Sequence, residues 1–182
     1  SPAFAEDPLR VLRVARFLAR FHHLGFSVAP ETLMLMRAIA ATDELQHLTR
    51  ERVWMELERS LGERNPEQFF LLLSHCGALA QLLPEIEQLF RGKDKDDALR
   101  ALDHCCRLTP DPVIRFATLC TFINADRVGV TQMLDRLKAP NDYKSLCPLA
   151  HQYAVELLKI DSLDADARLR LYEGLDLQRR PQ

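Results

Sequence analysis

Apolar residues recur at helical spacing between glycine and proline breaks, and this pattern most constrains how the chain can fold. After Pro30, for example, Leu33, Met36 and Ile39 follow at intervals of three residues, which places them on one face of a helix. The six glycines and ten prolines lie mainly where such runs begin or end. No segment alternates apolar and polar residues for long enough to form a strand. The sequence therefore predicts an all-α protein.

The breaks give approximate bounds for the helices, and one polar run divides them into two groups. The expected helices are residues 8–23, one from 30, 50–61, 66–77, 78–83, 85–90, 98–108, 113–123, one around 133–137, one around 153–158, and 165–174. Residues 91–97 form the one strongly polar run that contains a glycine, and we place a domain boundary there. The predicted domains are residues 1–92 and 93–182.

The composition is that of an ordinary globular protein. Of the 182 residues, 47% are hydrophobic and 27% are charged, and the formal net charge is −2. RNA binding would therefore depend on local basic stripes rather than on an overall positive field. No apolar run approaches the roughly 18 residues of a membrane span, so no membrane partner is expected. Five cysteines, an odd number, favour reduced thiols and a cytoplasmic location.

The first expected helix carries the polar pattern that most suggests a specific chemistry. Asp7 is a good N-cap and Pro8 a good first helical residue, because the missing N–H of proline would have no partner there. Asp7 lies three residues before Arg10, so a carboxylate and a guanidinium are neighbours on one surface. At about 100° per residue, four arginines share an arc of roughly 120°. They are Arg10, Arg13, Arg16 and Arg20.

Asp7 and Arg10 together can read a nucleobase. A carboxylate accepts hydrogen bonds and a guanidinium only donates them. Cytosine and adenine both offer an amino donor beside a ring-nitrogen acceptor, so Asp7 would accept from the amino group and Arg10 would donate to the ring nitrogen. Guanine and uracil present the opposite pattern. The alternative is that Asp7 only caps the helix and the arginines form a solvated face.

Several segments resemble motifs of one enzyme family in the same order. Residues 6–13 (Glu-Asp-Pro-Leu-Arg-Val-Leu-Arg) resemble the motif that ends the nucleotide-selecting region of class II tRNA nucleotidyltransferases, the CCA-adding enzymes. Bacterial poly(A) polymerases carry a close relative of this motif. The segments that continue the resemblance to the CCA-adding enzymes are residues 24–32, 48–56, 65–70, 76–79 and 83–86. Good resemblance covers residues 1–90 and thins out afterwards.

The resemblance implies an enzyme that adds or repairs the 3′-terminal CCA of tRNA from CTP and ATP. Its Mg²⁺ would be held by an N-terminal head, which we expect to precede this chain, so no catalytic or metal-binding residue is expected here. Asp7, Arg10 and Arg13 are the predicted nucleotide-binding residues. Glu6 would orient Arg10 through a charge-assisted pair. The later helices would guide the tRNA by shape and phosphate contacts.

A second charged pair, Arg52 and Glu56, lies in the segment resembling an Arg-x-x-x-Glu motif of the family. The resemblance implies that its helix supports the base-reading helix, so that both residues hold Asp7 and Arg10 in place. The alternative is an ordinary exposed pair four residues apart, worth about 0.3–0.5 kcal/mol. Trp54, between them, is predicted to be a core anchor rather than a stacking surface.

The second predicted domain resembles a metal-dependent phosphohydrolase domain of the His-Asp type that has lost its ligands. Residues 113–120 are similar to the helix that precedes the His-Asp pair, but Thr121 and Phe122 follow here. Neither is a plausible ligand for a hydrolytic divalent ion, so we expect a degenerate helical tail without phosphohydrolase activity. Residues 103–106 (Asp-His-Cys-Cys) have no second Cys/His cluster to complete a zinc site.

Two other functions remain compatible with these motifs. A poly(A) polymerase would share the first helix, and a non-enzymatic helical module would use the arginine face to bind RNA or a protein. The sequence leaves open the oligomeric state, the job of the second domain, and whether the parent enzyme adds all three nucleotides.

Overall fold

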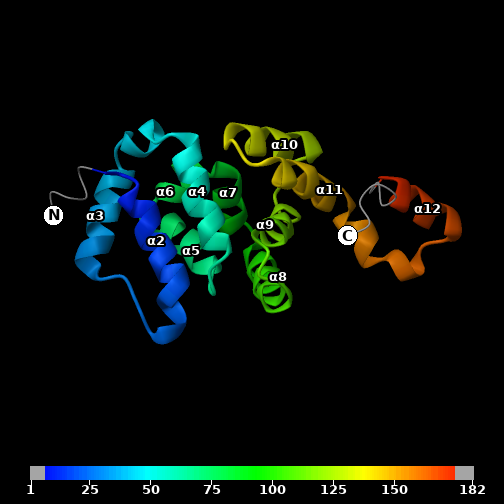
Figure 1. Ribbon diagram of the computed structural model, residues 1–182, viewed down its shortest axis with the longest axis horizontal. Coiled ribbons are helices and arrows are strands. Elements are labelled where there is room, and N and C mark those ends of the chain that lie inside the picture. Colours follow the sequence, from blue (N-terminus) through cyan, green and yellow to red (C-terminus); the bar gives the residue numbers. More distant parts are fainter. Residues whose placement is uncertain (1–6, 175–182) are drawn as a thin grey trace.

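The computed structural model describes residues 7–174, and every regular element in that range is a helix (Figure 1). The predicted all-α fold class is therefore confirmed. None of the described helices is both long and apolar enough to cross a membrane. Whether the second half is a degenerate phosphohydrolase domain stays a prediction.

The helices lie close to their expected positions. In chain order they are α2 (Arg10–Phe21), α3 (Pro30–Ala40), α4 (Arg50–Leu61), α5 (Glu67–Cys76), α6 (Ala78–Leu82), α7 (Pro84–Arg91), α8 (Lys95–Leu108), α9 (Pro112–Cys120), α10 (Arg127–Arg136), α11 (Asn141–Leu158) and α12 (Ala165–Gly174). Short 3₁₀ turns cover His22–Leu24, Glu44–His47 and Ile160–Ser162.

Prolines and caps set several of these bounds as expected. Pro30 occupies the first turn of α3, and Asp164 caps α12 by accepting a hydrogen bond from the Ala167 N–H at 2.7 Å. Gly77 ends α5 with a φ of +86°, a left-handed conformation that glycine adopts without a Cβ penalty. The largest difference is α11, which continues through the buried Pro148 and so begins well before the predicted bound. Proline removes one backbone donor, and packing against α9 retains the rest of the helix.

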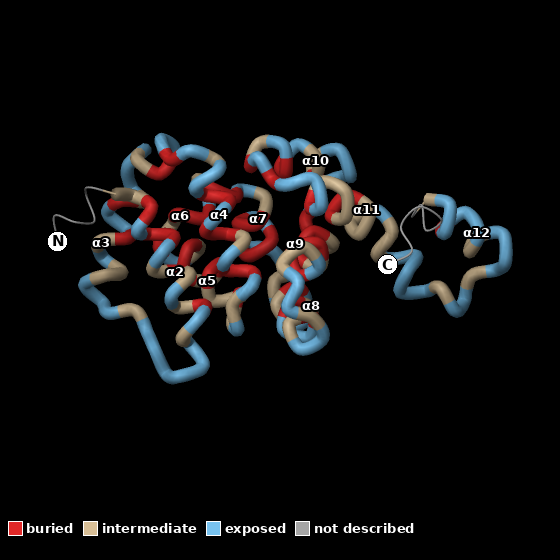
Figure 2. The backbone as a smooth tube through the Cα atoms, in the orientation of Figure 1, coloured by how far each residue is buried: buried red, intermediate tan, exposed pale blue. Residues whose placement is uncertain are grey.

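The helices gather around one continuous hydrophobic core. Helices α2 to α7 lie together at one end of the molecule, α8 to α11 follow beside them, and α12 extends away at the far end (Figure 1). Buried residues are concentrated in the first two groups, whereas most residues of α12 are exposed (Figure 2). The predicted domain boundary falls in the short turn between α7 and α8, but the core runs from Leu9 to Cys147 across it. The two-domain division stays a prediction.

Trp54 is a core anchor, as predicted. Its side chain is 5% exposed and meets the ring of Tyr143 edge-on at 4.6 Å and that of Phe116 at 5.9 Å. These contacts join α4 to α9 and α11. Burial, together with the nearby Glu58, raises the pKa of Tyr143, so the hydroxyl stays neutral inside this junction.

A buried arginine strengthens the same junction. Arg115 of α9 donates hydrogen bonds to the backbone oxygen of Leu61, the last residue of α4, at 2.7 Å and to that of Glu63, just beyond it, at 2.8 Å. It also donates to those of Thr109 at 2.9 Å and Cys106 at 3.3 Å, at the end of α8. Helix ends leave carbonyl groups without partners, and the guanidinium satisfies them. The C-terminal helices thereby fix the position of α4.

Candidate functional site

The polar residues predicted to read a nucleotide lie where α2 begins. The helix starts at Arg10 rather than at Pro8, because Pro8 and Leu9 form a turn. Leu9 is the N-cap residue, and no side chain caps the helix. Oδ1 of Asp7 accepts a hydrogen bond from the Leu9 N–H at 3.2 Å, within the turn that precedes the helix. The predictions of Asp7 as the N-cap and of Pro8 as the first helical residue were therefore wrong, because the turn at Pro8 and Leu9 moves the start of the helix to Arg10.

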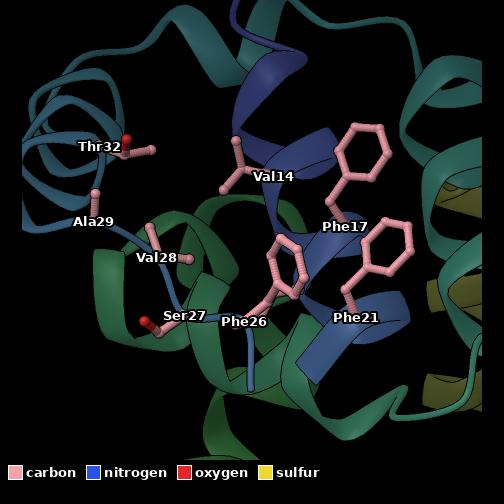
Figure 3. A pocket seen from close by; sticks show the side chains of 9 residues that line it. Val14, Phe17, Phe21, Phe26, Ser27, Val28, Ala29 and Thr32 are labelled. Carbon is pink, nitrogen blue, oxygen red and sulfur yellow. The ribbon is translucent and has the colours of Figure 1, made fainter. Parts of the chain in front are cut away.

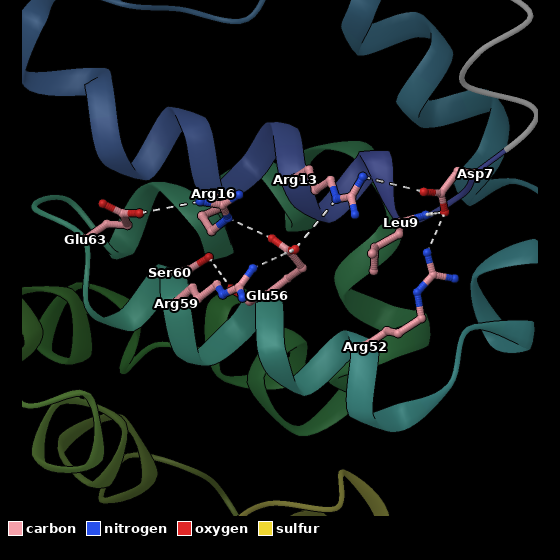
Figure 4. A network of polar contacts seen from close by, with 9 residues as sticks. All are labelled: Asp7, Leu9, Arg13, Arg16, Arg52, Glu56, Arg59, Ser60 and Glu63. Carbon is pink, nitrogen blue, oxygen red and sulfur yellow. Dashed lines mark hydrogen bonds and ion pairs between the residues drawn. The ribbon is translucent and has the colours of Figure 1, made fainter.

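Helix α4 holds the Asp7 carboxylate from the other side. Arg52 donates from Nη2 to Oδ1 of Asp7 at 3.1 Å, and Arg13 lies 3.7 Å from Oδ2 (Figure 4). Asp7 is half-buried and Arg52 is 44% exposed. Two arginines from two helices thus orient one carboxylate, and its more weakly engaged oxygen is Oδ2.

Glu56 is the buried centre of this charged cluster. Its side chain is 3% exposed and its Oε2 accepts a hydrogen bond from Nε of Arg16 at 2.7 Å. Nε of Arg13 lies 3.7 Å from Oε1, and Nη1 of Arg59 lies 4.0 Å from the same oxygen (Figure 4). A buried carboxylate is tolerated only when it is paired and hydrogen-bonded, and three guanidinium groups supply that compensation here.

The contacts follow the two helices in the same direction. Asp7 meets Arg52 near the start of both, Arg16 meets Glu56 further along, and Arg16 also lies 3.8 Å from Glu63 beyond the end of α4. The cluster therefore fixes how α2 is placed along α4, as well as how it is rotated. If α2 moved by one residue along α4, all three of these ion pairs would be disturbed together.

Arg10 projects from the same end of α2 into solvent. The residue is exposed, and within residues 7–174 it forms no hydrogen bond or ion pair. The predicted pairing of Glu6 with Arg10 falls outside the described residues. The structure thus brings Asp7, Arg10 and Arg13 together on one end of one helix.

Arg52 and Glu56 were both expected to hold Asp7 in place, but only one of them contacts it. Arg52 contacts Asp7 directly, whereas Glu56 contacts Arg13 and reaches Asp7 only through it. Sequence reasoning missed Arg16, which forms the shortest bond to Glu56. Glu56 lies four residues before Ser60, on the buried face of α4. A carboxylate on that face needs a cationic partner, and this position was the signal from which one could have been predicted.

The described residues do not form a metal site. In residues 7–174, no three His, Cys, Asp or Glu side chains gather closely enough to hold an ion. At the end of α9, the hydroxyl of Thr121 donates to the Thr118 backbone oxygen at 2.7 Å. Asp103, from the Asp-His-Cys-Cys segment, pairs with Arg107 at 2.8 Å. We therefore assign no step on these residues to a bound metal.

Three of the five cysteines have thiols of low reactivity. All five thiols are free, and burial raises the pKa of Cys76 and Cys120 and raises that of Cys106 to about 11. Because the thiolate is the nucleophile, these thiols are poorly reactive at neutral pH.

Comparison with known proteins finds relatives of this chain. The family described as "Probable RNA and SrmB-binding site of polymerase A" matches residues 25–90, which include helices α3 to α7. The Multifunctional CCA protein of Tolumonas auensis is 39% identical over 209 aligned residues, covering the whole of this chain. The chain is thus similar over its whole length to a multifunctional CCA protein. It spans about half the length of that relative, 51%, and corresponds to its C-terminal half. The resemblance seen in the motifs is thereby confirmed.

The charged cluster predicts a measurable loss of stability. Glu56→Gln retains the shape of the side chain but leaves three guanidinium groups without their carboxylate. We expect the free energy of unfolding to fall by about 2–4 kcal/mol, measured by urea denaturation followed by circular dichroism. Glu51, exposed on the same helix, is the matched control. Its change to Gln should cost less than about 0.5 kcal/mol, and equal small losses in both variants would contradict the role of Glu56.

Proposed function

We propose that this chain is the base-selecting and tRNA-binding part of a CCA-adding tRNA nucleotidyltransferase. The observation that carries the proposal is the Asp7 carboxylate held by Arg52 and Arg13, with the exposed Arg10 three residues further along the chain. The similarity to a multifunctional CCA protein supports it. Positioning matters because a binding group about 1 Å out of place can cost roughly a hundredfold in rate.

The selection step follows from the hydrogen-bonding capacity of the two side chains. Oδ1 of Asp7 already accepts from the Leu9 N–H and from Arg52, whereas Oδ2 is engaged only at 3.7 Å by Arg13. Oδ2 therefore accepts from the amino group of cytosine or adenine, and Arg10 donates to the adjacent ring nitrogen. Guanine and uracil would place acceptor against acceptor at Asp7 and donor against donor at Arg10. Arg13 completes the site by contacting the nucleotide or by keeping Asp7 aligned.

The remaining parts of the reaction belong to the longer protein. CTP and ATP are the proposed substrates, and Mg²⁺ would be bound by the half that precedes this sequence in its relative, where it would supply charge stabilisation to the transferring phosphate. Helices α3 to α7 would contact the tRNA, in keeping with their RNA-binding family. We propose a cytoplasmic enzyme, and we expect this chain by itself to add no nucleotide.

Changing Arg10 tests base selection directly. The protein is extended by the N-terminal half that its relative carries, and incorporation of each nucleotide into tRNA is measured. With Arg10→Ala we expect the preference for CTP and ATP over UTP and GTP to fall by about ten- to hundredfold, the value of one well-placed polar pair. Arg64→Ala, at an exposed arginine beyond α4, should leave the preference unchanged. An unchanged preference in Arg10→Ala would remove Arg10 from base reading.

The product formed by the same extended protein separates the second candidate. The matched RNA-binding family is named for polymerase A, so a poly(A) polymerase would share the described helices. A CCA-adding enzyme stops after a short CCA end, whereas a long adenosine tail would identify the polymerase. A protein that binds tRNA and adds nothing would instead support a non-enzymatic module.

The C-terminal helices are proposed to lack phosphohydrolase activity. Thr121 and Phe122 stand where the resembled domain carries its His-Asp ligands, and the hydroxyl of Thr121 is engaged by the backbone. We expect the purified chain to leave 2′,3′-cyclic AMP intact in the presence of Mg²⁺, Mn²⁺ or Ni²⁺, assayed by chromatography. Hydrolysis that requires the metal and is lost with a chelator would overturn this expectation.

A further inference from the structure

An open apolar groove continues from the candidate site along α2. It encloses about 330 Å³ between the second half of α2 and the segment that leads into α3 (Figure 3). Its aromatic lining consists of Phe17, Phe21 and Phe26, with Val14 and Val28 beside them. Phe17 is 49% exposed and Phe26 is 60% exposed, which is unusual for side chains of this size.

The aromatic rings form a ready-made stacking surface. Phe17 and Phe21 lie one helical turn apart with their ring centroids 6.2 Å apart and their planes only 11° from parallel. Phe26 meets Phe21 at 5.5 Å from the opposite side of the groove (Figure 3). A flat aromatic guest can stack on the exposed face of such a ring, because offset-stacked rings gain more than their buried area alone provides.

Positive charge flanks the same rings. The guanidinium carbon of Arg16 lies 5.0 Å from the Phe17 ring centroid, and that of Arg20 lies 5.3 Å from the Phe21 centroid. Between Pro8 and Pro30 the sequence contains four arginines and two histidines but no acidic residue, although the whole chain carries a net charge of −2. The groove is therefore complementary to a polyanion that also presents aromatic faces.

The groove is in line with the base-reading end of α2. At about 100° per residue, Arg10, Phe17 and Phe21 fall within roughly 40° on the helix surface. Phe17 lies about 10 Å beyond Arg10 along the axis, given a rise of about 1.5 Å per residue. One bound RNA strand can therefore contact both places.

We propose that this groove is a stacking platform for an unpaired nucleobase of bound RNA. The platform rests on the proposed tRNA-binding function and adds the residues that hold an unpaired nucleotide. Single-stranded nucleic acids are bound by aromatic side chains beside positive charge, and Phe17, Phe26 and Arg20 provide that combination. An apolar protein partner would use the groove but has no need of the flanking guanidinium groups.

The test compares three RNA hairpins at one salt concentration: one with a blunt stem, one with a four-nucleotide unpaired 3′ overhang, and one whose overhang is abasic. The full chain should bind the base-bearing overhang about tenfold more tightly than the other two, since stacking of one base is worth roughly that factor. Phe17→Leu and Phe26→Leu keep the apolar character but remove the π-face. Both should lose most of this preference and bind the blunt hairpin as the unchanged chain does.

Tyr172→Leu is the control, since this aromatic side chain is also exposed but lies on the distant α12. Equal binding of the abasic and base-bearing overhangs would overturn the platform, and so would Leu variants that retain the preference. In either case, measurable binding of the blunt hairpin leaves the proposed function standing. A chain that binds none of the three RNAs overturns both. If Phe17→Leu instead dissociates a dimer in sedimentation experiments without changing RNA affinity, the groove is a contact between copies of this chain.

Discussion

The placement of α2 against α4 depends on the buried carboxylate of Glu56. Apolar packing alone would hold the two helices together over a range of offsets, because the hydrophobic effect is non-directional. The contacts of Arg13 and Arg16 of α2 with the Glu56 carboxylate of α4 select one offset. That offset places Asp7 against Arg52, at the end of the helices where Arg10 projects. A structural ion cluster thus positions the residues proposed to read a base.

The C-terminal helices contribute to the same arrangement from behind. Arg115 binds carbonyl groups at the end of α4 and just beyond it, and Trp54 of α4 packs against Phe116 and Tyr143. The helix that carries Arg52 and Glu56 is therefore held on two sides, by α2 and by α9 with α11. This gives the second half a physical role that does not require a metal site of its own: it supports the helix that supports the site.

Sequence patterns predicted the local features well and the long-range pairings poorly. The helices, the cap at Asp164 and the burial of Trp54 follow from spacing, prolines and apolar character, which are properties of short windows. The partner of Glu56 could not be found in this way, because Arg16 is 40 residues away and its pairing depends on how α2 lies on α4. The exposed phenylalanines were missed for a related reason, since helical spacing does not show which apolar face remains uncovered.

The most direct measurement is a double-mutant cycle on the preference for CTP over UTP, in the protein extended by the N-terminal half of its relative. If Arg52 acts only by holding Asp7, then Arg52→Met and Asp7→Asn should each reduce the preference, and the double variant should be no worse than Asp7→Asn alone. Both single variants should remain folded, because Asp7 and Arg52 are only partly buried. Additive losses, or a preference that survives Arg52→Met unchanged, would contradict the account.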